Sequence, residues 1–211
     1  KNAQVEALTT AQVAALVTDD LAALKESQIK NVETADIVAL TTAQIQALTT
    51  KQLRALTTAQ VAALETADIV ALTTDQVAAL KNTQLKALTT DQIVALETAD
   101  IAALTTKTQL KSLTTLQVPA LTTAQIVALT TAQIASMQGT QIAALTTAQV
   151  VALETADVVA LTKTQIKKMS TAQIQALTTA QVGAMETADI ASLSTAQVAA
   201  LETADIVALT T

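Results

Sequence analysis

The acidic side chains of this sequence recur in pairs that could ligate a cation. Six segments read Glu-Thr-Ala-Asp, and the first three recur every 32 residues, supplying the pairs Glu33 and Asp36, Glu65 and Asp68, and Glu97 and Asp100. Calcium binds carboxylate oxygens, but a calcium site needs six or more oxygen ligands close together. We therefore interpret the pairs as helix-capping and surface residues, predict no metal site, and retain these six residues as candidates for one.

The composition excludes most other chemistry. None of the 211 residues is His, Cys, Phe, Tyr or Trp, so the chain has no thiol nucleophile, imidazole base, disulfide or cysteine–histidine zinc site. Met137, Met169 and Met185 remain as haem ligands, but each replaces a Leu of the repeat described below, which indicates a core role. We expect no catalytic residues, no cofactor and no enzymatic activity.

The charge balance bears on the choice of partner. The chain has 18 acidic and 12 basic residues, whereas nucleic-acid binding requires a basic surface and commonly uses aromatic stacking. We expect no nucleic-acid partner and interpret the Lys residues as solubilising charges. Thr, Gln and Asp interrupt every apolar run, so we also expect no membrane span, which needs about 18 consecutive apolar residues.

An apolar residue at every eighth position runs through the whole sequence. Leu or a substitute occupies this position from Leu8 to Leu104 and from Leu113 to Leu209, and 22 of the 26 positions are Leu. One inserted residue lengthens the repeat at 105–113 to nine residues. No linker or change of composition divides the chain, so we predict a single octapeptide-repeat array over residues 1–211.

The octad reads Leu-Thr-Thr-Ala-Gln-Val-Ala-Ala, with positions 1 to 8 counted from its Leu. Position 5 is Gln or Asp in all 26 octads, position 6 is Val, Ile or Leu, and position 7 accepts Lys and Arg. In one long helix the Leu would advance by about 80° around the axis per octad and form no face. Ala and Gln are poor strand formers, and two Gly leave few residues for tight turns.

One short helix per octad fits the pattern better. With Thr9 as N-cap, Gln12 lies at the third helical position, and Leu8 and Val13 form a hydrophobic staple around a capping box. Which Thr of a Thr-Thr pair caps the helix stays open. In the Glu-Thr-Ala-Asp octads, Glu is a poor cap, so we expect Thr34 and its equivalents to cap a helix that starts one residue later.

The predicted fold is an all-α solenoid of very short helices, one per eight-residue repeat. Such helices cannot stand alone, so stacking on neighbours must stabilise them. We expect Leu at position 1 and Val or Ile at position 6 to form the core, and position 7 to face water. Two octads per superhelical turn is our first choice, because a two-residue connection suits antiparallel neighbours, with three or four remaining open. Pro119 should distort its helix locally.

Two resemblances follow from the octad. Tandem Leu-Thr-Thr-Ala-Gln-Val-Ala-Ala-Leu octads resemble repeat tracts of very long bacterial secreted or surface proteins, often labelled adhesin-like or haem-utilisation-related. This resemblance covers the whole chain and implies an extracellular or cell-surface location. The run from Leu72 to Leu80 also looks like the opening helix of a TAL-effector repeat, Leu-Thr-Pro-Glu-Gln-Val-Val-Ala-Ile. The base-reading loop of that repeat is absent, so DNA binding is not carried over.

These features favour a structural role. We expect a spacer region of an extended rod, fibre or surface-layer assembly, whose partner is itself or a longer copy of the same array. The alternative is an adhesin-like scaffold that binds an extracellular protein or glycan, and a third hypothesis is a metal- or ice-binding repeat. Lys1 and Thr211 both fall within ordinary repeat sequence, without polar capping repeats, so we expect a stretch of a longer array or ends that bury against other copies.

Overall fold

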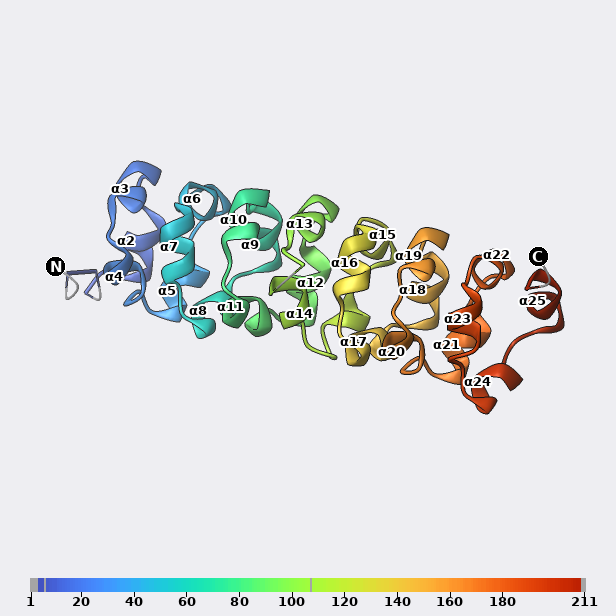
Figure 1. Ribbon diagram of the computed structural model, residues 1–211. Helices are drawn as coiled ribbons and strands as arrows, with labels where there is room; N and C mark the ends of the chain where they lie inside the picture. Colours follow the sequence, from blue (N-terminus) through green and yellow to red (C-terminus); the bar gives the residue numbers. More distant parts are fainter. Residues whose placement is uncertain (1–3, 6, 107, 210–211) are drawn as a thin grey trace. The chain divides into compact units, whose positions relative to one another are not determined.

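The computed structural model describes residues 4–5, 7–106 and 108–209, and all regular elements in this part of the chain are helices (Figure 1). The contacts divide the chain into two compact units, Lys1–Leu104 (unit 1) and Thr105–Thr211 (unit 2). The division falls where the nine-residue repeat begins. The chain ends discussed above, Lys1–Ala3 and Thr210–Thr211, lie outside the described residues.

Unit 1 confirms one short helix per octad. Its helices have four to six residues and are joined by short connections: α2 (Thr10–Ala14), α3 (Thr18–Ala23), α4 (Glu26–Ile29), α5 (Thr34–Val38), α6 (Thr42–Ala47), α7 (Thr50–Ala55), α8 (Thr58–Ala63), α9 (Thr66–Ala71), α10 (Thr74–Ala79), α11 (Asn82–Ala87), α12 (Thr90–Ala95) and α13 (Thr98–Ala103).

Unit 2 repeats the arrangement. Its elements are α14 (Gln109–Ser112), the 3₁₀ helix η1 (Val118–Ala120), α15 (Thr123–Val127), α16 (Thr131–Ser136), α17 (Gly139–Ala144), α18 (Thr147–Ala152), α19 (Thr155–Val159), α20 (Lys163–Ile166), α21 (Thr171–Ala176), α22 (Thr179–Gly183), α23 (Thr187–Ile190), α24 (Thr195–Ala199) and α25 (Thr203–Ala208). Pro119 lies within η1, so the expected local distortion takes the form of a 3₁₀ turn in place of an α-helix.

The capping box starts most of the helices as predicted, and in most Thr-Thr octads the first Thr is the cap, as at α2 and α6. Among the Thr-Thr octads the exceptions are α14 and η1, whose N-caps are Thr108 and Gln117. At α6 the Thr41 hydroxyl accepts a hydrogen bond from the Gln44 backbone N–H at 3.3 Å. The Gln44 side-chain Oε1 accepts one from the Thr41 backbone N–H at 2.8 Å. Two N–H groups that the helix itself cannot satisfy are thereby paired.

The prediction that Thr34 and its equivalents cap the Glu-Thr-Ala-Asp helices is wrong. Helices α5 and α9 begin at Thr34 and Thr66, with Glu33 and Glu65 in the N-cap position. At α9 the Asp68 carboxylate accepts the Glu65 backbone N–H at 3.1 Å, which replaces half of the capping box. The register therefore stays the same, because the core positions on either side keep their eight-residue spacing.

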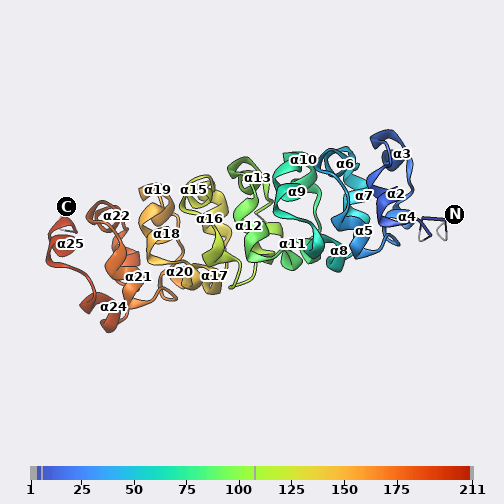
Figure 2. The same cartoon turned by 180° about the vertical axis from the view of Figure 1, so that it is seen from behind.

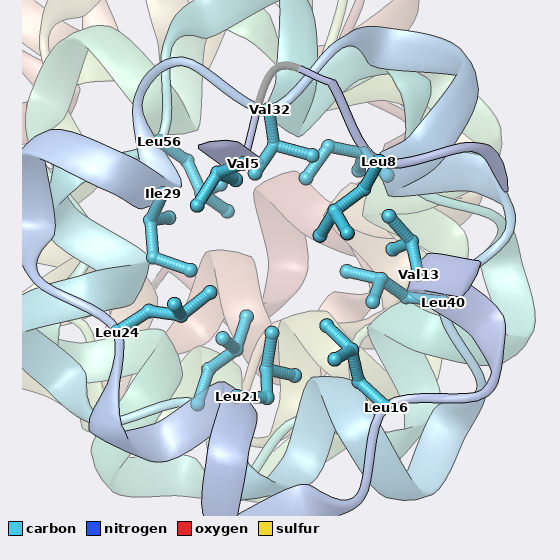
Figure 3. Close-up of a pocket in the computed structure, with 12 residues that line it drawn as sticks. Val5, Leu8, Val13, Leu16, Leu21, Leu24, Ile29, Val32, Leu40 and Leu56 are labelled. Atoms are coloured by element: carbon cyan, nitrogen blue, oxygen red, sulfur yellow. The ribbon is translucent and has the colours of Figure 1, made fainter. Parts of the chain in front are cut away.

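The core consists of the two predicted positions. Ile45 at position 6 is 0% exposed and Leu48 at position 1 is 3% exposed, whereas Val70 at position 7 is 51% exposed. Figure 3 shows the same arrangement in the first turns of unit 1, where apolar side chains such as Leu16 and Leu24 point inward around a common centre. The hollow at that centre measures ≈ 10 Å³, roughly the space of one water molecule, so it is packed core.

The expectation of two octads per superhelical turn is wrong. Helices three octads apart are in contact, such as α3 with α6 and α10 with α13 in unit 1, and α15 with α18 in unit 2. In both views of unit 1, α3, α6, α10 and α13 follow one another along one edge (Figures 1 and 2). A six-residue helix is only about 9 Å long, close to the distance between packed helices, so an antiparallel pair would leave no room for the core between them.

Candidate functional site

The position-5 side chains are polar groups inside the fold. Gln84 is 1% exposed and Gln92 is 2% exposed, and the other position-5 residues from Gln44 onward in unit 1 are equally buried. A buried amide destabilises a protein unless its hydrogen-bonding groups are satisfied. No buried side-chain nitrogen or oxygen among the described residues lacks a partner. The nitrogen and the oxygen of each buried position-5 amide must therefore both be hydrogen-bonded.

Gln84 of α11 shows how both ends of the amide are used. Its Oε1 accepts a hydrogen bond from the Lys81 backbone N–H at 2.9 Å, at the start of its own helix. Its Nε2 donates to the carbonyl oxygens of Leu53 at 2.8 Å and Leu56 at 2.9 Å, at the end of α7. One side chain thus pairs an N–H at the start of one helix and two C=O groups at the end of another.

The same bridge recurs through both units. In unit 2, Gln173 of α21 donates from Nε2 to the carbonyls of Ile142 at 2.9 Å and Leu145 at 2.7 Å, at the end of α17. Donor and acceptor residues lie 31 and 28 residues apart here, as they do at Gln84. That separation is three and a half to nearly four octads, so the Gln side chains join each superhelical turn to the preceding one. We call this contact the inter-turn glutamine bridge.

Sequence reasoning assigned position 5 only to the capping box and missed this bridge. The signal that could have revealed it is the absence of Glu. A capping box accepts Glu as readily as Gln at this position, yet none of the 26 octads has Glu there. Glu matches Gln in shape but lacks the Nε2 donor, so its exclusion indicates that a side chain long enough to reach the preceding turn must carry a donor there.

Aspartate at position 5 makes a different set of hydrogen bonds. Asp68 is 3% exposed and Asp100 is 1% exposed, and each accepts the N–H of its N-cap Glu at 3.1 Å. An ionised carboxylate has no proton to donate to the carbonyls of the preceding turn. Burial raises the pKa of both carboxyls above 3.8, and the nearby carboxylates of Glu65 and Glu97 raise it further, while their hydrogen bonds oppose the shift.

The candidate metal ligands are separated by this geometry. Glu33, Glu65 and Glu97 are exposed at N-caps, while Asp36, Asp68 and Asp100 are buried at position 5. The described residues contain no group of three or more acidic side chains that could hold a metal ion. The buried carboxyls of Asp68 and Asp100 serve as hydrogen-bond acceptors for the starts of their helices.

The helices bear on the expectation that no segment spans a membrane. Over residues 4–5, 7–106 and 108–209, the structure contains no helix with the length and apolar character required to cross a bilayer.

Comparison with known proteins identifies the repeat. No curated protein matches the chain in sequence. The family described as ALTTAQ repeat matches in six tandem segments, residues 29–66, 61–98, 93–131, 126–155, 150–187 and 182–211. Most successive segments begin about 32 residues apart, which is four octads. These matches cover the chain from residue 29 to its last residue, and the chain therefore belongs to the ALTTAQ repeat family.

Proposed function

We propose that this chain is a structural spacer within an extended rod, fibre or surface-layer assembly. The inter-turn glutamine bridge is the observation that carries the proposal. At Gln84 the polar groups that end one turn are paired with those that begin the next, so each turn presents the surface on which a further turn can stack. The rod then lengthens by the addition of repeats, and the inter-turn glutamine bridge stays the same.

The proposal includes the absence of an enzymatic role. The buried polar side chains of each turn are engaged in backbone hydrogen bonds, as at Gln84 and Gln173, and this leaves them unable to act on a substrate. An extracellular or cell-surface location is also part of the proposal, and its support is the resemblance of the octads to bacterial surface-protein repeats.

An adhesin-like scaffold for a protein or glycan is the second candidate. It is favoured by exposed valines at position 7 on neighbouring helices of unit 2, where Val127 of α15 is 50% exposed and Val151 of α18 is 47% exposed. Apolar side chains gathered on a surface are typical of binding sites. A glycan array probed with the chain tests this candidate, with the Val127→Thr/Val151→Thr variant as control. Binding that the variant loses would favour the scaffold.

Small-angle X-ray scattering tests the spacer directly. We would compare the full chain with a fusion of two full chains in tandem. A rod that lengthens by stacking should increase its radius of gyration about twofold. A compact protein of twice the length increases it only about 1.3-fold, since its radius scales as the 0.38 power of chain length. A ratio near 1.3 would contradict the spacer proposal.

A further inference from the structure

We propose that unit 1 binds an acidic polysaccharide in a groove lined by cations. The groove consists of Lys25, Lys51, Arg54 and Lys81 together with Glu26, and we call it the basic groove. The proposal goes beyond the spacer function, because it adds a ligand to the rod. It also concerns a different surface from the exposed valines of unit 2.

The cations of unit 1 gather on three of its helices. All described Lys and Arg residues of the unit lie on or directly beside α4, α7 and α11: Lys25, Lys30, Lys51, Arg54, Lys81 and Lys86. The described acidic residues of unit 1 lie on or beside other helices, with Glu26 of α4 as the exception. Charges that only keep a protein soluble need not separate in this way, so the arrangement favours a surface that attracts an anion.

Two hollows connect these helices. The first measures ≈ 420 Å³ and has Lys25, Glu26 and Lys51 in its lining. The second measures ≈ 260 Å³ and has Glu26, Lys51, Arg54 and Lys81 in its lining. Because Glu26 and Lys51 line both hollows, the two adjoin. Helices α4 and α7 are in contact, and the inter-turn glutamine bridge joins the start of α11 to the end of α7, so the walls of the groove are held in place.

The lining selects among anionic ligands. The four cations are exposed and can donate hydrogen bonds to carboxylate or sulfate groups, for which the fork of Arg54 offers two parallel donors. Ionised Glu26 only accepts hydrogen bonds, and it repels an anion. A ligand that lies along the groove must therefore place hydroxyl donors beside its anionic groups. An acidic polysaccharide does so, because its charged groups are separated by sugar hydroxyls.

Other anionic partners fit the groove less well. A nucleic acid carries its charges more densely, whereas residues 1–104 have 12 acidic and 7 basic residues and the chain has no aromatic side chain for bases to stack on. A bilayer surface is flat and cannot enter the hollows, and the exposed valines Val38, Val70 and Val94 lie on other helices. An acidic peptide with a carboxylate on every residue would be repelled by Glu26.

Two double variants test the groove with residues that the repeat already uses. The groove variant is Lys51→Ala with Lys81→Thr, because Ala and Thr are the common residues at positions 4 and 2. The matched control is Lys30→Gln with Lys86→Gln, which copies Gln46 at position 7. Lys30 and Lys86 lie at the ends of α4 and α11, outside the two hollows. Both variants therefore remove two cations from the same set of helices, and only one of them changes the groove.

Fluorescence anisotropy of labelled hyaluronan, titrated with the full chain, gives the readout. Hyaluronan has one carboxylate on every second sugar, and neutral dextran is the uncharged control. We expect binding at about 0.01 M salt that disappears at about 1 M, where the Debye length is about 3 Å. At about 0.1 M salt the groove variant should bind at least about tenfold more weakly, and the matched control within about threefold of the wild type.

Several results would overturn the proposal. They are a wild type that does not bind hyaluronan at low salt, equal losses in the groove variant and the matched control, and equal binding of dextran. Tighter binding of single-stranded DNA, polyglutamate or phosphatidylserine vesicles than of hyaluronan would also overturn it, and would assign the groove to that partner.

The outcome is separable from those of the functional proposals. A compact tandem fusion in the scattering experiment would refute the spacer, whether or not the chain binds hyaluronan. Failure to bind hyaluronan would leave the spacer intact. The Val127→Thr/Val151→Thr variant should bind hyaluronan as the wild type does, because its substitutions lie in unit 2. Loss of binding in that variant would place the ligand on the valines and refute the groove.

Discussion

Replacing Gln92 by Glu separates the two roles of the position-5 side chain. The Gln92 Oε1 accepts the Thr89 N–H at 2.8 Å, while its Nε2 donates to the carbonyls of Val61 at 3.0 Å and Leu64 at 2.7 Å. Glu keeps the shape and the capping acceptor, and a capping box accepts either residue. An ionised Glu would instead direct a carboxylate oxygen at two carbonyl oxygens.

The expected loss follows from these contacts. A buried group left without its hydrogen-bond partner costs about 1–3 kcal/mol, and an uncompensated buried charge costs about 3–5 kcal/mol. The carboxyl can reduce the second cost by taking up a proton, which then restores one donor. We therefore expect Gln92→Glu to lower the local free energy of unfolding by about 2–4 kcal/mol at pH 7, and by less in acid.

Gln12→Glu is the matched control. Gln12 is exposed and accepts the Thr9 N–H at 2.8 Å, so its substitution keeps the cap and should change stability by less than about 0.5 kcal/mol. Native-state hydrogen exchange at amides of α8 and α12 is the appropriate assay, because a repeat array need not unfold as one cooperative unit. Unchanged or increased protection in Gln92→Glu would refute the bridge.

Three further predictions, made with four variants, test the packing and the charges. Asp68→Gln should stabilise its turn by about 1 kcal/mol in hydrogen exchange, because the new amide gains a donor. Burial raises the pKa of Asp68, so the folded state holds that proton more tightly. Its contribution to stability should therefore fall as pH rises from 3.8 through the raised pKa, a slope that Asp68→Gln removes in denaturant titrations at several pH values. Leu56→Ala should lower the free energy of unfolding by about 2–5 kcal/mol, and Arg54→Ala by less than about 1 kcal/mol. Hydrogen exchange in Leu56→Ala should become faster only in nearby octads. A uniform increase of exchange along the chain would contradict stacked repeats. Gly183→Ala should stabilise the fold by about 0.5–1 kcal/mol and so raise the melting temperature. The φ of Gly183 is not positive, and the added Cβ would lie 3.4 Å from its nearest neighbour. A lower melting temperature would indicate a clash.

Local features of the fold could be predicted from the sequence because they depend on residues within one octad. Thr41 and Gln44 are three residues apart, and their reciprocal hydrogen bonds follow from helix geometry alone. The core could also be predicted, because apolar residues such as Ile45 and Leu48 occupy fixed positions of every octad, while position 7 varies in charge. Glu65 at an N-cap was missed because the core register overrides the preference of a single cap residue.

Non-local features could not be derived in this way. The number of octads per turn depends on how the chain bends at each connection, and the octad sequence alone does not specify that angle. The inter-turn bridge from Gln84 to Leu53 joins residues that only the superhelix brings together. Lys51 and Lys81 likewise lie far apart in sequence, and the superhelix brings them to one hollow.

The bridge between turns can be observed by NMR as scalar coupling through the hydrogen bond. In the labelled chain, we predict correlations from the Gln84 side-chain nitrogen to the carbonyl carbons of Leu53 and Leu56, with slow exchange of the Gln84 amide protons. The exposed amide of Gln12 should exchange rapidly in the same sample. Correlations to residues two octads earlier, or a Gln84 amide that exchanges as fast as that of Gln12, would contradict the stacking of turns through position 5.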